Sequence, residues 1–384
     1  MIKRDAEKQL IRLSKTFKLV SLTGPRQTGK TTLVRAVFKD KPYINLENPD
    51  TRRFASEDPR GFLDTYPDGA VLDEVQRVPE LFAWLQERAD HTRNPGMYIL
   101  TGSNNFLMQQ EVSQSLAGRT GSLVLLPFSL GELSPAMRPL TDDEMIITGF
   151  YPPVYDQKIP PQDWCPNYIR TYIERDVRQI RNIVDLLPFQ RFLSLLAGRC
   201  SQELNMSALS VEAGVDNKTI QAWIGLLESS YLIFLLKPHS VNFNKTIVKR
   251  PKVYFYDTAL ACSLLGIYNT SHLQTHPARG ALFENMLVSE ISKFITHAGS
   301  RLRLFYGREK SGHEIVLLIE RDGELLPLEI KSGKTIHSEH FRNLDYYRRL
   351  SGAAKCFLIY GGEESQKRSN GTEVINWRKF VTNL

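Results

Sequence analysis

The chain has 384 residues, a formal net charge of +7, 42% hydrophobic residues and 24% charged residues. The composition is typical of soluble proteins, and the length allows two or three domains that each bury a core of their own. No stretch approaches the roughly 20 apolar residues that span a bilayer, and the polar N-terminus is unlike a signal peptide, so we expect a cytoplasmic protein with no membrane contact.

The cysteines and the distribution of charge indicate which kinds of site and partner this protein could have. The 4 cysteines include no CxxC pair and therefore predict reduced, structural thiols and no zinc site. Residues 1–150 contain 19 basic and 19 acidic residues, so the whole basic surplus lies beyond residue 150. A basic C-terminal part is compatible with nucleic acid binding, and equally with a solvated basic surface.

The first motif is a phosphate-binding loop. The stretch "TGPRQTGKTTL" lies between an apolar strand run and an apolar helical run, and follows the pattern Gly-x-x-x-x-Gly-Lys-Thr. Its glycines let backbone N–H groups surround phosphates, and the following helix directs its positive end toward them. We expect Lys30 to reach the β- and γ-phosphates of ATP and Thr31 to hold Mg²⁺. The predicted nucleotide-binding residues here are Gly24, Pro25, Arg26, Gln27, Thr28, Gly29, Lys30, Thr31 and Thr32.

A pair of acids supplies the second half of a P-loop site. Asp73 and Glu74 directly follow the apolar run at 70–72. We expect Asp73 to hold Mg²⁺ through water and Glu74 to deprotonate the attacking water. Two acids after an apolar run usually indicate only a loop, and the P-loop upstream favours the catalytic interpretation.

Polar residues near two further strands are candidates for sensing nucleotide. In "GMYILTGSNNF", Ser103 or Asn104 would lie near the γ-phosphate, although turn chemistry explains both residues equally well. In "SLAGRTGSLVLL", Arg119 precedes a strand, where a ring-forming ATPase places an arginine that reaches the neighbouring subunit's nucleotide. The alternative is a surface arginine. Arg119 is thus the basis for expecting a homo-oligomeric ring with a finger acting in trans.

Several stretches together carry a family resemblance. They are "TGPRQTGKTTL", "VLDEVQRVPELF", "ILTGSN", "SLAGR" and "LPFSLGE", followed by "YIRTYIERDV", "LLESSYLI", "RGALFEN" and "LEIKS". The chain resembles prokaryotic AAA-type ATPases that carry a C-terminal domain of long-unassigned function with a restriction-endonuclease-like core. The resemblance implies an α/β fold: an AAA-type P-loop parallel sheet in 1–140, a helical and winged-helix part in 141–275, and a nuclease-like α/β domain in 276–384.

The middle part has the rhythm of a helix-turn-helix. In "NMSALSVEAGVDNKTIQAWIGLL", we expect Ser207 to cap a short helix, Gly214 to end it and Asn217 to cap a longer one. Such a unit presents the start of its second helix to the DNA major groove, and a basic segment downstream would contact phosphates. A protein-binding or lid module with an unknown protein partner is the alternative. The candidate contacts with double-stranded DNA are Lys218, Thr219, Gln221, Lys249 and Arg250.

The C-terminal part contains a β-hairpin with a nuclease-like spacing. "EIVLLIERDGELLPLEIK" predicts two strands joined by a two-residue turn at 322–323. That turn would place Val316 opposite Glu329, and Glu314 opposite Lys331. A glutamate and a lysine separated by one residue after such a hairpin are typical of a metal-dependent nuclease.

The expected metal site of that nuclease is damaged. It needs two carboxylates on one Mg²⁺, and the resemblance places an aspartate where this chain has Val316. It also places an accessory acid at Glu284. Glu314 either rescues the metal site or forms a cross-strand ion pair with Lys331. We expect a degenerate site, comprising Glu284, Glu314, Glu329 and Lys331, that binds DNA or a partner without cutting.

The sequence as a whole therefore predicts an ATPase that uses ATP and Mg²⁺ and whose nucleotide state controls a winged-helix and nuclease-like module associated with DNA. The alternatives are a nucleotide-gated DNA-binding or protein adaptor without significant turnover, and an ATP-dependent nuclease.

Overall fold

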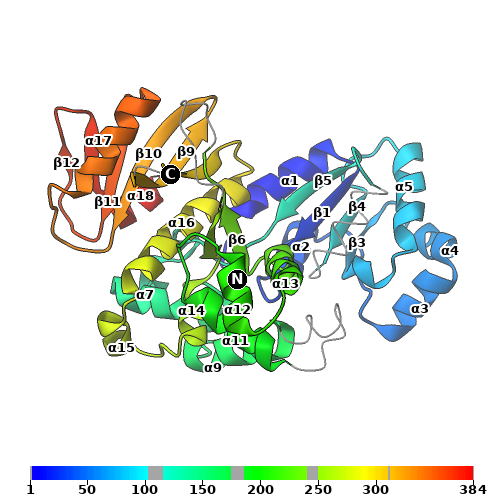
Figure 1. Ribbon diagram of the computed structural model, residues 1–384. Helices are drawn as coiled ribbons and strands as arrows, with labels where there is room; N and C mark the ends of the chain where they lie inside the picture. The colour runs from blue at the N-terminus through cyan, green and yellow to red at the C-terminus, as the bar shows by residue number, and fades with distance from the viewer. Residues whose placement is uncertain (1, 103–115, 174–185, 240–249, 310–311, 384) are drawn as a thin grey trace. The chain divides into compact units, whose positions relative to one another are not determined.

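The computed structural model divides into two compact units, which are described separately (Figure 1). The described residues are 2–102, 116–173, 186–239, 250–309 and 312–383. Unit 1 comprises Met1–Phe128, Ser229–Tyr231 and Thr296–Ser300, and unit 2 comprises the remaining residues. Within the described residues, no helix is both long enough and apolar enough to cross a membrane.

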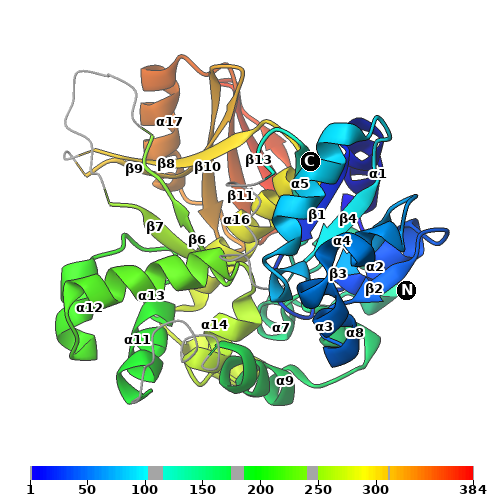
Figure 2. The ribbon, with the colours of Figure 1, turned by 90° about the vertical axis from the view of Figure 1, so that its right-hand side faces the viewer.

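Unit 1 is built on a five-stranded parallel sheet with the strand order β2-β3-β4-β1-β5 (Figures 1 and 2). The strands are β1 (Leu19–Thr23), β2 (Tyr43–Asn45), β3 (Ala70–Asp73), β4 (Tyr98–Thr101) and β5 (Thr120–Val124). Because all strands run in one direction, their C-terminal ends lie at one edge of the sheet, where ligands of open α/β sheets bind. The predicted parallel P-loop sheet is therefore confirmed.

Helices cover both faces of this sheet, so the inner strands β1, β3 and β4 are buried along their whole length, whereas the edge strand β5 alternates in burial. Leu19 and Leu72 pack in one hydrophobic cluster with Phe62 and Phe82, whereas the neighbouring Val20 packs in a second cluster on the opposite face. The helices of unit 1 are α1 (Ala6–Thr16), α2 (Lys30–Val37), α3 (Pro49–Glu57), α4 (Pro59–Asp64) and α5 (Leu81–His91), with a 3₁₀ turn η1 (Val75–Arg77) after β3.

Unit 2 begins with helices and a two-stranded ribbon. The helices are α7 (Asp142–Thr148), α8 (Pro152–Asp156), α9 (Pro161–Tyr168), α11 (Leu187–Ala197), α12 (Met206–Ala213) and α13 (Asn217–Ser229). The antiparallel strands β6 (Ile233–Leu236) and β7 (Lys252–Phe255) follow, and Glu203 makes an isolated bridge with Lys252. Helices α14 (Thr258–Leu264), α15 (Thr270–Thr275) and α16 (Arg279–Ala298) come next.

The predicted helix-turn-helix has its helices in place, with different caps. Gly214 ends α12 with φ 74°, as predicted. The cap of α12 is Asn205, which accepts from Ala208 N at 3.2 Å, so the prediction of Ser207 is wrong. Asp216 accepts from Thr219 N at 2.8 Å, so Asn217 is not the cap of α13. In each case an asparagine or aspartate one or two residues earlier is the cap, because its side-chain oxygen accepts from a backbone N–H three residues ahead.

The second part of unit 2 is a six-stranded mixed sheet with the strand order β12-β13-β11-β10-β9-β8. Side chains of α17, including Phe341 and Leu344, pack in one cluster with Leu358 of β11. The elements are β8 (Arg303–Arg308), β9 (Glu314–Arg321), β10 (Glu324–Lys331), α17 (His340–Ser351), β11 (Cys356–Tyr360), β12 (Gln366–Lys367), β13 (Thr372–Asn376) and α18 (Trp377–Thr382).

The β9–β10 hairpin forms the predicted turn but not the whole predicted register. Asp322 and Gly323 have φ 51° and 88°, as a type I′ turn requires, and the ladder runs from Arg321↔Glu324 to Leu317↔Leu328. It ends there. The predicted pairs Val316↔Glu329 and Glu314↔Lys331 are therefore not formed.

A β-bulge explains this difference. Between two pairs of the β8–β9 ladder, β8 advances from Phe305 to Gly307 while β9 advances from Leu318 to Ile315. The extra residue in β9 shifts the side-chain alternation, because successive residues of a strand face opposite sides. Accordingly Ile315 and Leu318, three residues apart, pack in the same cluster. Glu314 is thus carried away from the position that a regular hairpin gives it.

Candidate functional site

The phosphate-binding loop of unit 1 connects β1 to α2 and depends on two glycines. Gly24 has φ 144°, and a Cβ there would lie 2.2 Å from the carbonyl oxygen of Leu125. Gly29 has φ 87° and directly precedes Lys30, the first residue of α2. Both positions exclude other residues, the first by backbone clash and the second by its left-handed conformation. This is the local geometry that leaves backbone N–H groups available to phosphate.

Lys30 is buried in this loop. Its Nζ donates to the carbonyl oxygens of Gly24 at 2.9 Å and Pro25 at 2.7 Å. Burial lowers the pKa of Lys30 to about 8, against the opposing effect of the Glu74 and Asp73 carboxylates. The ammonium is therefore held by neutral acceptors, and a phosphate group would be a better partner for it.

Asp73, at the end of β3, collects three hydroxyl donors. Thr31 Oγ1 donates to Asp73 Oδ2 at 2.7 Å, Tyr43 donates to the same oxygen at 2.5 Å, and Thr101 donates to Oδ1. The order β2-β3-β4 explains the convergence, because Tyr43 begins β2 and Thr101 ends β4, on either side of Asp73. The threonine hydroxyl and the carboxylate are hard oxygen donors that fit Mg²⁺. Tyr43 and Thr101 were not predicted, because only the strand order brings them here.

Glu74 follows Asp73 in a strained conformation. Its φ of 56° is left-handed, which costs a residue with a Cβ roughly 1–2 kcal/mol and is common at functional positions. Gln76, within η1, donates from Nε2 to Glu74 Oε2 at 2.6 Å. The turn therefore directs the Glu74 side chain away from the line of the strand, and the bond from Gln76 holds the carboxylate close to η1.

Arg4 is a support of the loop that sequence reasoning missed. It is 4% exposed and donates to the carbonyl oxygens of Thr28 at 2.6 Å and Leu126 at 2.7 Å, while its guanidinium lies 4.7 Å from the ring centre of Phe128. A charged donor thereby fixes the loop carbonyl that precedes Gly29. A lone arginine before the first helix gives no sequence signal of this role.

The other predicted residues of unit 1 do not join this cluster. Ser103 and Asn104 lie outside the described residues. Arg119 forms a two-pronged ion pair with Asp90, with Nε–Oδ1 at 2.6 Å and Nη2–Oδ2 at 2.9 Å. Its action on a neighbouring subunit stays a prediction.

The candidate DNA contacts differ in their availability. Lys218, Gln221 and Arg250 are exposed. Thr219 donates its hydroxyl to Asp216 at 3.1 Å, because it belongs to the cap of α13. Lys249 lies outside the described residues.

In unit 2, a lysine ammonium lies among the acids of the predicted nuclease-like site. Lys252 is 3% exposed, and its Nζ lies 2.6 Å from Glu314 Oε1 and 3.6 Å from Glu284 Oε1. Arg308 Nη1 lies 3.1 Å from Glu314 Oε2, and Tyr254 donates to Glu284 at 2.7 Å. Burial alone would lower the pKa of Lys252, but the two carboxylates raise it above its usual value. The ammonium therefore stays charged where a metal-dependent enzyme would hold a cation.

Glu329 and Lys331 pair with each other, and not as predicted across the hairpin. Lys331 Nζ lies 2.7 Å from Glu329 Oε1, whereas Glu314 pairs with Lys252 and Arg308. The alternative in which Glu314 pairs with Lys331 across the hairpin is thus wrong, and the bulge in β9 is the reason. Among the described residues, no three His, Cys, Asp or Glu side chains are placed to hold a metal ion.

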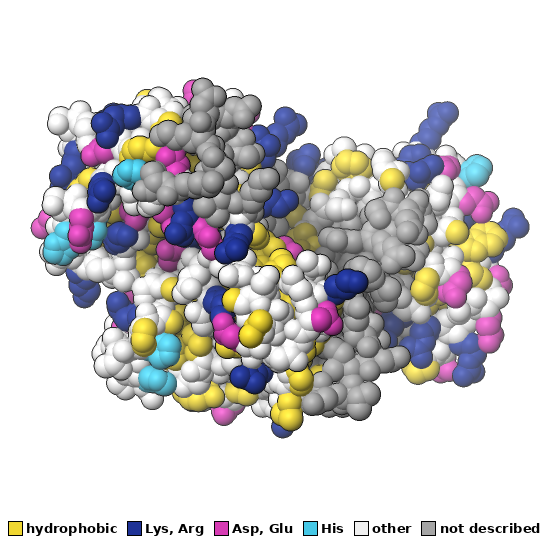
Figure 3. Space-filling view, viewed as in Figure 1, with side chains coloured by type: hydrophobic (Ala, Val, Ile, Leu, Met, Phe, Trp, Pro, Cys, Tyr) yellow, Lys and Arg dark blue, Asp and Glu magenta, His cyan; other side chains and the backbone are white. Residues whose placement is uncertain are grey.

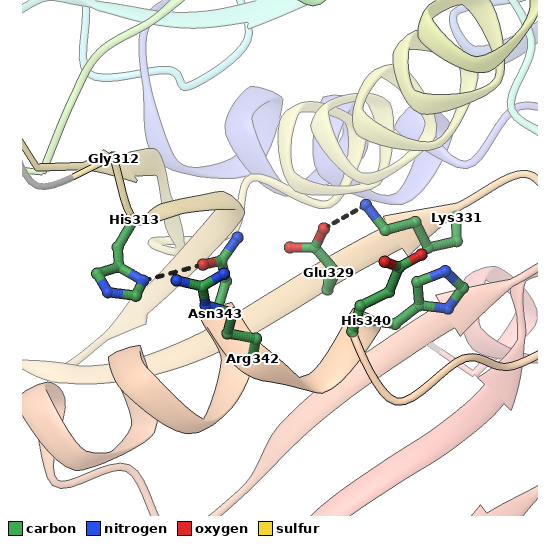
Figure 4. Close-up of a pocket in the computed structure, with 8 residues that line it drawn as sticks. Gly312, His313, Glu329, Lys331, His340, Arg342 and Asn343 are labelled. Carbon is green, nitrogen blue, oxygen red and sulfur yellow. Dashed lines mark hydrogen bonds and ion pairs between the residues drawn. The ribbon is translucent and has the colours of Figure 1, made fainter.

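A polar cavity lies beside this pair. It is lined by residues before β9, at the end of β10 and in the first turn of α17, and Figure 4 shows the Glu329 carboxylate bonded to Lys331. On the other side of the view, His313 Nδ1 lies 3.2 Å from Asn343 Oδ1.

The parallel sheet, the loop with its two glycines and the Thr31–Asp73 contact define unit 1 as a P-loop ATPase-like domain. Family models agree in detail. Residues 16–134 match the AAA domain model AAA_14, residues 142–271 match a domain of unknown function (DUF8612), and residues 279–380 match a domain of unknown function (DUF4143). The chain thus combines an AAA domain with a C-terminal DUF4143 domain.

Individual relatives are similar along most of the chain. The chain is 29% identical over 367 residues to the uncharacterized protein Rv2008c of Mycobacterium tuberculosis. This alignment covers 94% of this chain and 80% of that protein. It is 24% identical over 362 residues to the uncharacterized protein MJ1544 of Methanocaldococcus jannaschii, covering 85% and 77%. Among solved structures, the Walker-type ATPase PABY2304 of Pyrococcus abyssi is similar with a TM-score of 0.48 at 16% identity, covering 69% of this chain and 96% of that one.

Proposed function

We propose that unit 1 binds ATP with Mg²⁺ and hydrolyses it. The observation that carries this proposal is the contact between Thr31 Oγ1 and Asp73 Oδ2, which is 2.7 Å long, in a loop where Asp73 also acts electrostatically on the buried Lys30. Thr31 and Asp73 would hold Mg²⁺, and bound Mg²⁺ would neutralise phosphate charge. Lys30 would leave the carbonyls of Gly24 and Pro25 to pair with the β- and γ-phosphates.

Glu74 is the proposed base for the attacking water. Its position one residue beyond Asp73 suits that role, and its bond to Gln76 keeps the carboxylate at the edge of the sheet where nucleotide binds. The hydrogen bond from the Gln76 amide to Glu74 would then break each time Glu74 accepts a proton from the attacking water. This arrangement also supports the second candidate function, a nucleotide-gated adaptor with little turnover, if the Gln76 bond persists when ATP is bound.

Phosphate release from the purified chain, with and without double-stranded DNA, tests the ATPase proposal. Glu74→Gln is the control, since it removes the base and keeps the side-chain volume. DNA-stimulated turnover that disappears in the control supports a nucleic-acid-responsive ATPase. Turnover near zero in the wild type, with nucleotide still bound, would establish the adaptor in its place.

We further propose that the helices of unit 2 from α11 to α13, with β6 and β7, form a winged helix that contacts the DNA backbone. The order of three helices and an antiparallel ribbon supports this, as do the exposed side chains of Lys218 and Gln221 at the start of α13. In Figure 3, Lys and Arg side chains are interspersed with Asp and Glu on the face shown, so on that face phosphate contacts would be local.

Binding of fluorescent duplex DNA at several salt concentrations tests this contact. Lys218→Ala should weaken binding of all sequences alike and lower the salt dependence by about one counterion. An unchanged salt dependence would remove Lys218 from the interface. Comparing ADP with a non-hydrolysable ATP analogue shows whether nucleotide state controls the module.

The C-terminal domain is proposed to bind without cutting. The Lys252 ammonium supports this, because it lies between the carboxylates of Glu284 and Glu314 that a catalytic Mg²⁺ would need. Mg²⁺- or Mn²⁺-dependent cleavage of DNA that disappears in Glu329→Ala would overturn this part and restore an ATP-dependent nuclease.

Assembly into a ring is the remaining proposal. It depends on Arg119, which would exchange its contact with Asp90 for a phosphate of the neighbouring subunit. Sedimentation with and without a non-hydrolysable ATP analogue checks it, and a monomer under both conditions would exclude the trans role.

A further inference from the structure

The cavity beside β10 in unit 2 has the features of a binding site for a small anion. Its volume is about 460 Å³, and its lining is predominantly polar. The ladder between β9 and β10 ends at the pair Leu317↔Leu328, and the cavity lies beyond that pair. His313, which precedes β9, and Glu329, which follows Leu328, both line it. The bulge in β9 thus creates room that a regular hairpin would fill with paired strands.

One wall of the cavity carries an acceptor that lacks a partner. Glu329 is 4% exposed, and its Oε1 receives the Lys331 ammonium at 2.7 Å. Its second oxygen, Oε2, is buried and has no hydrogen-bond partner among the described residues. In Figure 4 this oxygen points away from Lys331, toward the side of the cavity where Arg342 and Asn343 lie. A buried carboxylate oxygen without a donor costs free energy, which a ligand that brings a hydrogen would recover.

The same cavity offers two cationic side chains, which lie beside the carboxylates of Glu329 and Glu339. Lys331 keeps part of its side chain exposed, and Arg342, from the first turn of α17, has a guanidinium without a partner among the described residues. His340 lies in the same turn, and burial together with the nearby Lys331 charge lowers its pKa. The neutral imidazole, which this shift favours, can donate or accept a hydrogen bond. A ligand that fits must present anionic oxygens to Lys331 and Arg342 and a hydrogen to Glu329.

We propose that this cavity binds a phosphomonoester, with its P–OH group donating to Glu329 Oε2 and its anionic oxygens accepting from Lys331 and Arg342. A phosphodiester or a sulfate has oxygens for the two cations but no hydrogen for the carboxylate. The cavity therefore selects a terminal phosphate over an internal one.

The selection requires an ionised Glu329 carboxylate, so that the shared hydrogen comes from the P–OH group of the ligand. Burial raises the pKa of Glu329, so the carboxyl is more easily protonated than an exposed one. A phosphomonoester has a second pKa of about 6, so near that pH it carries a P–OH hydrogen that it can donate to the Glu329 carboxylate. The proposed contacts involve protein side chains and the ligand alone. The inference is independent of the proposed ATP hydrolysis in unit 1.

Calorimetric titration of the full chain with inorganic phosphate and with sulfate, at about pH 6, tests this inference. All proteins in the experiment carry Lys30→Ala, so that the phosphate-binding loop of unit 1 does not contribute. We expect phosphate to bind about tenfold or more tightly than sulfate, since sulfate leaves Glu329 without a donor. Equal affinities, or no binding of phosphate, would overturn the proposal.

Three variants separate the contributions. Glu329→Gln keeps the shape of the side chain and can donate to either anion, so the preference for phosphate should disappear. Lys331→Met should weaken binding of both anions. Lys334→Met is the matched control, because Lys334 is exposed and outside the cavity lining, and it should bind as the parent does. A phosphate preference that survives Glu329→Gln would contradict the assignment, and thermal melts confirm that each variant is folded.

Competition identifies the source of the phosphate. An oligonucleotide with a 5′-phosphate that displaces inorganic phosphate, while its 5′-hydroxyl counterpart does not, assigns the cavity to nucleic acid ends. Displacement by adenosine monophosphate but not by the phosphorylated oligonucleotide assigns it to free mononucleotides. Displacement by the 5′-hydroxyl oligonucleotide as well would contradict selection of the terminal phosphate.

Discussion

Replacement of Lys252 by methionine is the sharpest test of the buried charge cluster in unit 2. Methionine keeps the length of the side chain and removes the ammonium, which lies 2.6 Å from Glu314 and 3.6 Å from Glu284. Both acids lose their closest cation. Glu314 keeps Arg308 at 3.1 Å, and Glu284 keeps the hydroxyl of Tyr254 at 2.7 Å.

Removing one partner of a buried ion pair typically destabilises a protein by about 3–5 kcal/mol, because an uncompensated charge remains. The remaining contacts of Glu314 and Glu284 place Lys252→Met at the lower end, near 3 kcal/mol. The exposed pair of Arg321 and Asp322, 3.9 Å apart with side chains 81% and 90% exposed, is the matched comparison. For Arg321→Met we expect less than about 0.5 kcal/mol.

The loss should depend on pH with a definite sign. Burial already raises the pKa of Glu284, and without Lys252 it rises further. A carboxyl with a raised folded-state pKa takes up a proton on folding, so its destabilising effect is absent below the unfolded pKa of about 4.3 and grows as pH rises through the folded pKa. Lys252→Met should therefore differ from the wild type much more at pH 8 than at pH 5.

Urea unfolding followed by tryptophan fluorescence measures this difference, since Trp164, Trp223 and Trp377 lie in unit 2. The double variant with Glu314→Gln should recover part of the loss, because it removes one of the orphaned charges. A destabilisation below about 1 kcal/mol, or one that is the same at both pH values, would refute the placement of a charged Lys252 among these acids.

Three predictions concern unit 1. Glu74→Gln should lower the rate of ATP turnover about 100-fold or more while nucleotide affinity stays unchanged, and a parallel loss of binding in fluorescence titrations would contradict its role as base. Burial lowers the pKa of Lys30 to about 8, so nucleotide binding near that pH should be accompanied by proton uptake. The heat of binding measured by calorimetry should therefore vary with the ionisation enthalpy of the buffer. Equal heats in all buffers would contradict this prediction. Arg4→Met should raise the Kd for ADP about tenfold or more, because the Thr28 carbonyl loses a charged donor, while the exposed neighbour Lys3→Met should leave it unchanged.

Local patterns in the sequence predicted the parts of this protein that depend on neighbouring residues. The P-loop, the acids after the apolar run at 70–72 and the turn at Asp322 and Gly323 each follow from backbone requirements within a few residues. The predicted N-caps of α12 and α13 were two positions and one position too late. For α13, Asp216 and Asn217 have nearly equal capping ability, and the backbone conformation in the folded structure decides which of them is the cap.

Contacts between distant segments could not be predicted in the same way. Tyr43 and Thr101 meet Asp73 because their strands flank β3, and Arg4 reaches the loop only after α1 has packed on the sheet. None of these three residues belongs to a local motif.

The sequence by itself determined that this chain carries a P-loop domain and a hairpin with Glu329 and Lys331 at its end, because those features are local. Only the tertiary structure decided what the acids of the C-terminal domain do. One extra residue in β9 shifts the strand's alternation and separates Glu314 from Lys331, and Lys252, more than 60 residues earlier in the chain, brings its ammonium to Glu314. A bulge and a long-range ion pair depend on packing across the whole domain, so neither can be predicted from a short stretch of sequence.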